Sequence, residues 1–331
     1  MKDKITIGIF IDTFFPMIDG VIMVVDNYAK RLKKYANVIV FAPSIDKNFD
    51  DKNLEYKVVR CKAIKLPFLD YSLPIPKLDK RFEEIVKDYK LDIVHIHSPA
   101  TLGLLGINYA EKHSIPVVGA LHSQYKADFK RALKSELVSS KITKEVTKIY
   151  NKCDEVWTVN EEVAKIFKEE YGYKKEPRIM YNATEMVKVK NKKEADAVID
   201  NLHDLNKDDK VLLFVGRINK LKNLFFIIDA LKVLENKNFK YKMLFVGSGQ
   251  DEEELKNYIK EKEIKNVILC GKVTDRKLLS YYYSRADLFL FPSLYDASSI
   301  VQIEAASQCT PGLFLKGAAT AGTVKDNRNI K

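Results

Sequence analysis

Short apolar runs alternate with amphipathic helical stretches along this chain. In the first half, apolar runs of strand length lie at residues 5–11, 38–42, 93–96, 117–121 and 156–159. After the first run, Val21, Val24, Val25, Tyr28 and Leu32 fall on one face of a helix. This alternation is typical of βαβ units that build a parallel sheet. The sequence therefore predicts an α/β fold.

The same alternation of strand-length apolar runs and amphipathic helices occurs again in the second half of the chain. Strands are expected at residues 211–215, 243–246, 267–270 and 288–291, with helices near 223–235, 251–261 and 276–284. Residues 185–210 are poor in aromatic residues and rich in Lys, Asn and Asp, which is typical of a domain boundary. We expect a first domain at 1–182, a polar linker at 183–209 and a second domain at 210–331. Two doubly wound, Rossmann-like domains facing each other across a cleft would bind ligands at the carboxyl ends of their strands.

The composition is that of an ordinary soluble protein, with 46% hydrophobic and 31% charged residues. The first apolar run is stopped by Asp12 and no small-residue cleavage site follows, so a cytoplasmic location is expected. No apolar stretch approaches the roughly 18 residues of a membrane span. The four cysteines are scattered, which argues against a disulfide framework or a zinc site. They are Cys61, Cys153, Cys270 and Cys309.

The formal net charge is +11. Nucleic acid, an anionic membrane surface and anionic substrates are the partners that such a charge can serve, and a lysine-rich composition without any binding role is the alternative. The sequence contains no recognised nucleic-acid-binding module and no basic sheet studded with aromatic residues. We therefore expect no nucleic-acid partner.

Two cations follow the first strand of the second half. Arg217 lies just past the run 211–215, and Lys222 follows five residues later at the entry to a helix. A guanidinium acts as a planar fork and an ammonium as a point charge, so the two together suit a diphosphate. The alternative is a pair of solvated loop cations.

Two carboxylates, Asp296 and Glu304, flank a helix start near the end of the chain. Free backbone N–H groups near Ser299 and Ile300 would form an anion site, with Ser298 and Ser299 as possible caps. Glu304 is set among apolar residues, where an unpaired carboxylate is costly, and it would accept hydrogen bonds from a ribose diol. Asp296 would hold sugar hydroxyls. The alternative is a capping aspartate and a surface glutamate.

With these blocks the chain resembles the GT-B glycosyltransferases, and in particular the large retaining, family 4-like group that includes bacterial lipid and cell-envelope sugar transferases. The resemblance covers nearly the whole chain. It rests on Gly216-Arg217 with Lys222, on Gly247-Ser248-Gly249, on Gly271-Lys272-Val273 and on Asp296 with Glu304. The family usually has Glu where this chain has Asp296, which keeps the carboxylate but shortens its reach.

The resemblance also assigns roles to other positions. It implies that Gly20 lets the backbone approach the donor phosphates or the acceptor, although a simple turn glycine is the alternative. It implies that the backbone at Val273 contacts the nucleotide base and that His122 faces the donor sugar. From the sequence alone, without this resemblance, His122 is interpreted as a loop histidine whose hydrogen bonds are satisfied within the protein. His95 and His97 alternate along a strand end, and His97, nearer the carboxyl edge, is the better candidate for the cleft.

The function that the resemblance implies is retaining transfer of a sugar from a nucleoside-diphosphate donor, UDP- or GDP-linked, to a lipid or envelope-glycan acceptor at the cytosolic membrane face. No Asp-x-Asp triplet occurs in the chain, so Arg217 and Lys222 are expected to neutralise the leaving diphosphate without a metal or another cofactor. The alternative is a catalytically inactive remnant that binds a membrane or a partner. Epimerase or phosphorylase activity on the same fold stays open.

The segment that begins at Lys126 and ends at Lys152 interleaves basic and apolar residues. Such a pattern forms a surface for anionic lipid, or else a helix pair with a solvated lysine face. A further expectation concerns the end of the chain. Relatives continue for several dozen residues beyond a segment like 323–329, so the second domain is expected to be incomplete.

Overall fold

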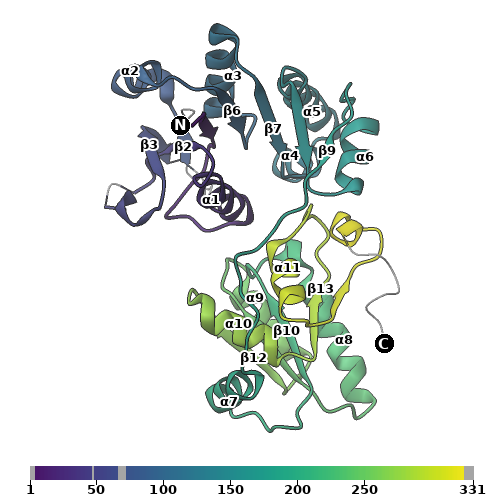
Figure 1. Ribbon diagram of the computed structural model, residues 1–331. Helices are drawn as coiled ribbons and strands as arrows, with labels where there is room; N and C mark the ends of the chain where they lie inside the picture. The colour runs from purple at the N-terminus through teal and green to yellow at the C-terminus, as the bar shows by residue number, and fades with distance from the viewer. Residues whose placement is uncertain (1–3, 47, 66–71, 324–331) are drawn as a thin grey trace. The chain divides into compact units, whose positions relative to one another are not determined.

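The computed structural model describes residues 4–46, 48–65 and 72–323, which divide into two compact units (Figure 1). The first unit ends at Tyr181 and the second begins at Asn182. Each unit is built on its own parallel sheet with helices between the strands. The predicted α/β class with two Rossmann-like domains is confirmed.

The sheet of unit 1 has the strand order β3-β2-β1-β6-β7-β8-β9, with every pairing parallel. Its strands are β1 (Thr6–Phe10), β2 (Asn37–Pro43), β3 (Lys57–Cys61), β6 (Ile93–Ile96), β7 (Val117–Leu121), β8 (Glu155–Thr158) and β9 (Arg178–Ile179). The helices are α1 (Gly20–Leu32), α2 (Lys80–Asp88), α3 (Thr101–His113), α4 (Tyr125–Leu133), α5 (Glu136–Asn151) and α6 (Glu161–Glu169). A small antiparallel pair, β4 (Ala63–Lys65) and β5 (Ser72–Pro74), and two 3-10 turns, η1 (Asp51–Asn53) and η2 (Pro76–Leu78), complete it.

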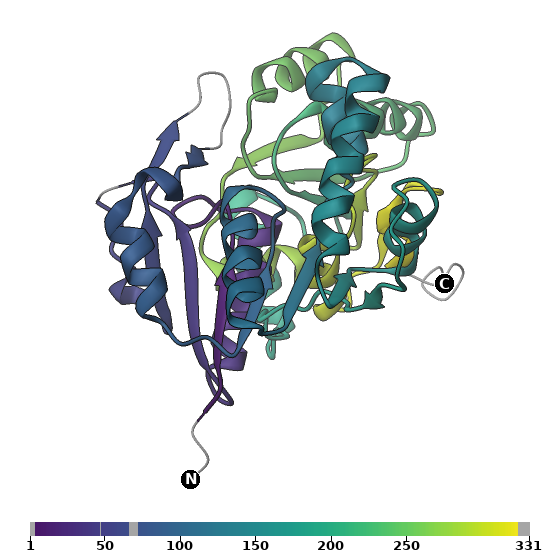
Figure 2. The ribbon, with the colours of Figure 1, turned by 90° about the horizontal axis from the view of Figure 1, so that it is seen from above.

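The strands of unit 1 are continuous apolar runs because helices cover the faces of the sheet. Strand β2 is buried from Val38 through Pro43, and β1 from Ile7 onward. Helix α1 begins where Asp19 accepts a hydrogen bond from the Ile22 amide at 2.9 Å, and it buries Val25 and Ala29 in the core. Helix α3 lies alongside β1 and β6 (Figure 2).

The sheet of unit 2 has the strand order β12-β11-β10-β13-β14, again parallel throughout. Its strands are β10 (Val211–Val215), β11 (Lys242–Val246), β12 (Val267–Gly271), β13 (Leu288–Phe291) and β14 (Gly312–Phe314). The helices are α7 (Lys192–His203), α8 (Leu224–Asn236), α9 (Glu252–Glu261), α10 (Arg276–Arg285) and α11 (Ile300–Ser307), with 3-10 turns η3 (Lys220–Lys222) and η4 (Ala319–Thr323). In both units the chain reverses its direction of winding at the first strand, which is the point where doubly wound sheets bind ligands.

Residues 183–209, expected as a polar linker, differ from that expectation. They contain α7, which buries Ala195 and Ile199 and packs on α10. Arg285 of α10 lies 2.6 Å from Asp200 of α7, and this ion pair joins the two helices. The stretch is polar because only a narrow face of α7 is buried, and it belongs to unit 2.

The turns that follow β10 and β11 lie in close contact. The Gly216 amide donates to the Val246 carbonyl and the Ile218 amide donates to the Ser248 carbonyl, both at 3.0 Å. Gly247 has φ +141°, and a Cβ there would lie 1.8 Å from the Gly216 carbonyl oxygen. A side chain at position 247 would therefore displace the loop that carries Arg217.

Candidate functional site

The loops after β10 and β13 meet at the carboxyl edge of the unit 2 sheet, because these strands are neighbours. The carbonyl oxygen of Leu221, in η3, accepts hydrogen bonds from the Ser293 hydroxyl and the Leu294 amide, each at 3.3 Å. Arg217 lies two residues past β10 with an exposed side chain. The first predicted cation therefore lies on the same loop as η3, which ends at Lys222.

Lys222 and Asp296 are brought together as an ion pair. The Lys222 Nζ lies 2.7 Å from Asp296 Oδ1 and 2.5 Å from Oδ2, and 5.3 Å from the centre of the Phe291 ring. Both side chains are largely buried, with 17% and 25% of their surface exposed. The sequence assigned the lysine to the diphosphate and the aspartate to the sugar, and did not foresee their contact.

Helix α11 begins without a side-chain cap. Ser299 is the N-cap residue but its side chain makes no capping hydrogen bond, and Ile300 follows as the first helical residue. The Ser298 hydroxyl is buried and has no hydrogen-bond partner in the part of the chain that the structure describes. The expected serine caps are therefore not formed, and neither serine side chain accepts a hydrogen bond from an amide of the first turn. A helix N-terminus in this state favours an anion.

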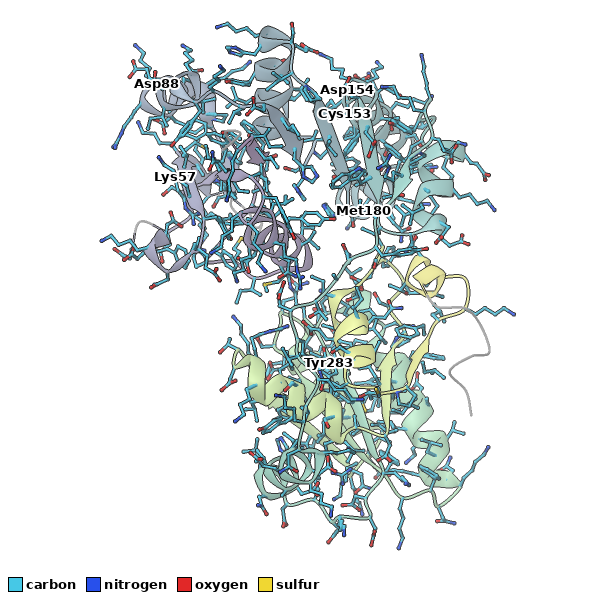
Figure 3. All side chains as sticks on the ribbon, viewed as in Figure 1. Lys57, Asp88, Cys153, Asp154, Met180 and Tyr283 are labelled. Carbon is cyan, nitrogen blue, oxygen red and sulfur yellow. The ribbon has the colours of Figure 1, made fainter. Side chains whose placement is uncertain are left out.

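Glu304 lies inside α11, with 2% of its surface exposed. Its Oε2 accepts a hydrogen bond from the Tyr283 hydroxyl at 2.9 Å, and its Oε1 lies 2.6 Å from Arg276 Nη2. Burial, together with the nearby Glu304, holds the pKa of Tyr283 well above its usual range, so the phenol stays protonated as a donor. Figure 3 labels Tyr283, which belongs to α10 in unit 2. The predicted ribose acceptor is thus already held by two side chains.

Sequence reasoning missed Tyr283 and Arg276. The available signal was their spacing of seven residues, which places both on one face of α10, opposite a carboxylate that needs partners. Val273 lies in the loop between β12 and α10, three residues before Arg276, and packs partly buried against the core of unit 2. This loop therefore carries both the predicted base-contacting residue and a partner of Glu304.

In unit 1, Gly20 is the first residue of α1. Its φ lies outside the left-handed region, and a Cβ built on it would meet no heavy atom within 4 Å. Neither the backbone nor the packing requires glycine here. The conformation and the packing therefore do not explain why glycine stands at this position.

His97 and His122 form one hydrogen bond, with 2.9 Å between His97 Nδ1 and His122 Nε2. Their rings are nearly parallel, at 10°, with centres 5.1 Å apart. His95 lies against His97 with ring centres 4.2 Å apart, so the two share a face as predicted. Burial lowers the pKa of His122 to about 4 and of His95 to about 3, and it holds the pKa of His97 well below its usual range. All three rings are neutral at pH 7.

Aromatic rings from other elements close the histidine cluster. The Trp157 ring of β8 lies 4.8 Å from His95, and the Tyr28 ring of α1 lies 5.7 Å from His97, measured between ring centres. These neighbours explain why the histidines are desolvated. The sequence indicated the histidines but not this packing, which depends on the strand order.

Asp12 is a buried carboxylate that the sequence marked only as the end of an apolar run. It accepts hydrogen bonds from the Leu102 amide and the Thr101 hydroxyl at 2.9 Å, and from the Ser98 hydroxyl. Burial is the largest influence on its pKa and raises it, against these hydrogen bonds. Asp12 thus ties the carboxyl end of β1 to the start of α3.

The basic segment of residues 126–152 forms α4 and α5, which pack on each other. Apolar side chains are exposed where the two helices join, with Leu137 85% exposed and Leu133 and Val138 each 45%. Lys126 and Lys130 both pair with Glu136, at 3.0 and 2.8 Å. Lys134 and Lys141 are exposed. The side chain of Arg131 lies outside the described residues.

The described residues contain no group of three or more His, Cys, Asp or Glu side chains arranged to hold a metal ion. Across the same part of the chain, no helix combines the length and apolar character needed to cross a bilayer.

Comparison with protein families identifies both units. Residues 18–186, about half of the chain, match Glycosyltransferase Family 4, and residues 196–329 match Glycosyl transferases group 1. Among curated proteins, the chain is 25% identical to the alpha-monoglucosyldiacylglycerol synthase of Streptococcus pneumoniae, over 92% of this chain and 70% of that protein. It is also 25% identical to the synthase of the same name from Acholeplasma laidlawii, over 98% of this chain and 83% of that protein.

Solved structures show the same fold. Anabaena HepE in complex with UDP and glucose superposes with a TM-score of 0.74 at 15% identity, over 97% of this chain and 83% of that one. Sucrose-phosphate synthase from Thermosynechococcus elongatus superposes with a TM-score of 0.77 at 18% identity, over 97% of this chain and 84% of that one. The chain adopts the GT-B fold and belongs to the Glycosyltransferase Family 4 group of glycosyltransferases.

Proposed function

We propose that this glycosyltransferase moves a sugar from a UDP- or GDP-linked donor to a lipid or envelope-glycan acceptor at the cytosolic membrane face, with retention of configuration and without a metal. The observation that carries the proposal is the carboxyl edge of the unit 2 sheet. There, the loop bearing Arg217 and Lys222 is hydrogen-bonded to the loop that leads into the uncapped α11. The structures that resemble this chain include one that holds UDP and glucose.

At the diphosphate, two kinds of group act together. The amides around Ser299 and Ile300 at the α11 N-terminus donate to phosphate oxygens, as helix N-termini do for anions generally. Lys222 and Arg217 add fixed positive charge that stabilises the diphosphate as it leaves. Such stabilisation is stronger in the transition state than in the ground state, because negative charge develops on the leaving oxygen. A metal ion is not needed for this step.

The rest of the donor is assigned to neighbouring groups. An ammonium has three N–H donors, and Asp296 engages Lys222 while keeping acceptor capacity for a sugar hydroxyl. Glu304 also keeps lone pairs for the ribose diol, with Tyr283 fixing its orientation. The backbone at Val273 is proposed to contact the base. In unit 1, Gly20 leaves space at the α1 N-terminus, and His122 and His97 are proposed to serve the sugar.

The acceptor proposal rests on the relatives and on α4–α5. Two relatives are named as alpha-monoglucosyldiacylglycerol synthases, which favours a diacylglycerol lipid as acceptor. The α4–α5 turn exposes Leu133 and Leu137 next to Lys134. Apolar side chains beside exposed lysines suit the interface of an anionic bilayer. We therefore propose peripheral attachment through this turn.

The decisive experiment measures nucleotide release from UDP- and GDP-sugars, with and without vesicles that contain diacylglycerol. Release that depends on lipid, with a glycolipid product whose anomeric configuration by NMR matches the donor, is the expected result. The Lys222→Ala variant should lose it, whereas Lys220→Ala, which removes an exposed lysine from the same turn, should not. A chain that binds vesicles but releases no nucleotide from any donor would instead be the inactive remnant.

A further inference from the structure

The hydrogen bond between His97 and His122 leaves one nitrogen of His97 without a partner. His97 is 2% exposed, and its Nε2 is buried with no hydrogen-bond partner among the described residues. His122 is only partly buried, and the described part of the chain provides no hydrogen bond to its Nδ1. One histidine therefore carries an unsatisfied nitrogen inside the protein, and the other keeps a nitrogen for a ligand.

Because both rings are neutral, each carries a single N–H group. Two arrangements satisfy their shared hydrogen bond. In the first, His97 Nδ1–H donates to His122 Nε2, so the proton of His122 lies on Nδ1 and a lone pair is buried on His97 Nε2. In the second, His122 Nε2–H donates to His97 Nδ1, and His97 buries an N–H group without an acceptor.

The two arrangements differ in what is left unsatisfied. Buried N–H donors without an acceptor are rarer in proteins than buried acceptors without a donor. In the second arrangement, the Tyr28 ring 5.7 Å away offers the buried N–H at best an N–H···π contact, which is a second-order interaction. The first arrangement is therefore the more stable one.

We propose that His97 is a positioning residue: it donates from Nδ1 to His122 Nε2 and so fixes His122 as the tautomer with its proton on Nδ1. His122 then presents a hydrogen-bond donor to its ligand. The preferred ligand group is a sugar oxygen with a free lone pair, such as a hydroxyl or an acetamido carbonyl. A protonated amine at that position is disfavoured, because it offers only donors. The identity of the ligand as a donor sugar rests on the proposed function; the tautomer does not.

The tautomer is tested on the unliganded chain. Long-range ¹H–¹⁵N correlation spectra of protein labelled with ¹⁵N-histidine distinguish protonation at Nδ1 from protonation at Nε2. The chain has five histidines, and the spectrum of His122→Gln assigns the signal of interest. We expect both His97 and His122 to be protonated at Nδ1 at pH 7.5. Protonation of His122 at Nε2 would overturn the proposal, whatever the enzyme's activity.

A matched pair of variants separates positioning from packing. His95→Leu and His97→Leu remove equally buried imidazoles near the end of β6, but only His97 bonds His122. His97→Leu should give His122 mixed tautomers and raise the donor KM by up to about tenfold, the size of one neutral hydrogen bond. His97→Asn, whose amide can donate from a similar place, should restore the Nδ1 tautomer. If the two leucine variants changed the His122 tautomer and the donor KM equally, His97 would contribute only packing and the positioning role would be refuted.

These experiments distinguish failure of the tautomer assignment from failure of the proposed function. If His97→Leu does not fold, the spectrum of the parent chain still decides the tautomer. If no nucleotide-sugar is turned over, the proposed function fails while the tautomer assignment stands. If turnover is present and His122 carries its proton on Nε2, only the positioning role of His97 falls.

Discussion

The ammonium of Lys222 reaches both carboxylate oxygens of Asp296, at 2.7 and 2.5 Å. The lysine is therefore oriented before any ligand arrives, by a residue 74 positions later in the chain. A side chain that is already fixed loses little conformational entropy when it binds a phosphate, which favours its use in a transition state. In the proposed function, this pair joins the residue assigned to the diphosphate to the residue assigned to the sugar.

The first prediction concerns the two cations. Lys222→Ala or Arg217→Ala should each lower kcat about 10²-fold or more, because each removes charge stabilisation made in the transition state. Nucleotide release at saturating donor is the measurement. Lys220→Ala is the control, since Lys220 is exposed and pairs with Glu254 at 2.8 Å. Near-parental rates in either variant would refute the diphosphate assignment.

The second prediction concerns the partner of Glu304. Tyr283→Phe leaves a buried carboxylate oxygen without its donor, so unit 2 should lose about 1–3 kcal/mol of unfolding free energy. Urea unfolding followed on the unit 2 transition measures this. Tyr258→Phe provides the comparison, because its hydroxyl bonds the exposed Asp229 at 2.7 Å and should contribute little. Equal losses would mean that Glu304 does not depend on Tyr283.

The third prediction is that catalysis persists without a metal. Nucleotide release should continue in excess EDTA, because protein cations and helix amides supply the positive charge at the diphosphate. A rate that is lost in EDTA and restored by Mg²⁺ or Mn²⁺ would show that a metal ion, and not the protein cations and helix amides, neutralises the diphosphate.

The fourth prediction follows from the histidine cluster. The folded-state pKa values of His95 and His122, about 3 and about 4, lie below the ordinary value of 6.5. Between those values and 6.5 the unfolded chain takes up protons that the folded chain does not. Stability is therefore full above pH 6.5 and falls as the pH drops toward 4, by about 1.4 kcal/mol per pH unit for each group.

The melting temperature of unit 1 between pH 7.5 and 5 measures this dependence. His95→Leu should make it shallower, because one titrating group is removed. His113→Leu is the control, since His113 lies exposed at the end of α3. A melting temperature that does not change between pH 7.5 and 5 would contradict the assigned burial.

The fifth prediction concerns the α4–α5 turn. Leu137→Asp should abolish binding to anionic vesicles, whereas Leu78→Asp, which changes another leucine of unit 1 that is 70% exposed, should not. Replacing Lys134 and Lys141 by Gln should weaken binding, and raising the salt to physiological strength should do the same, because screening acts over about 8 Å. Equal binding to neutral vesicles would leave α4–α5 as a solvated helix pair.

The sequence predicted the strands that are buried on both faces, since a run such as 211–215 has no other stable environment. It missed α7, whose small apolar face looked like a linker. The reason is that an element which buries little surface carries a weak hydrophobic pattern.

The candidate site was predictable in its chemistry but not in its contacts. A carboxylate within an apolar helix indicated that Glu304 has partners, yet Tyr283 and Arg276 depend on how α10 packs against α11. The pairing of Lys222 with Asp296 depends on β10 lying beside β13, which no local pattern states. Serine at 298 and 299 indicated caps, and the structure leaves α11 without one.

The hydrogen bonds from Ser293 and Leu294 to the Leu221 carbonyl fix the first residues of the loop after β13 against η3. An insertion or deletion between residues 292 and 294 would break these bonds and displace the η3 turn. At residues 292–294, evolution or design is therefore confined to exchanging side chains, while the number of residues stays constant.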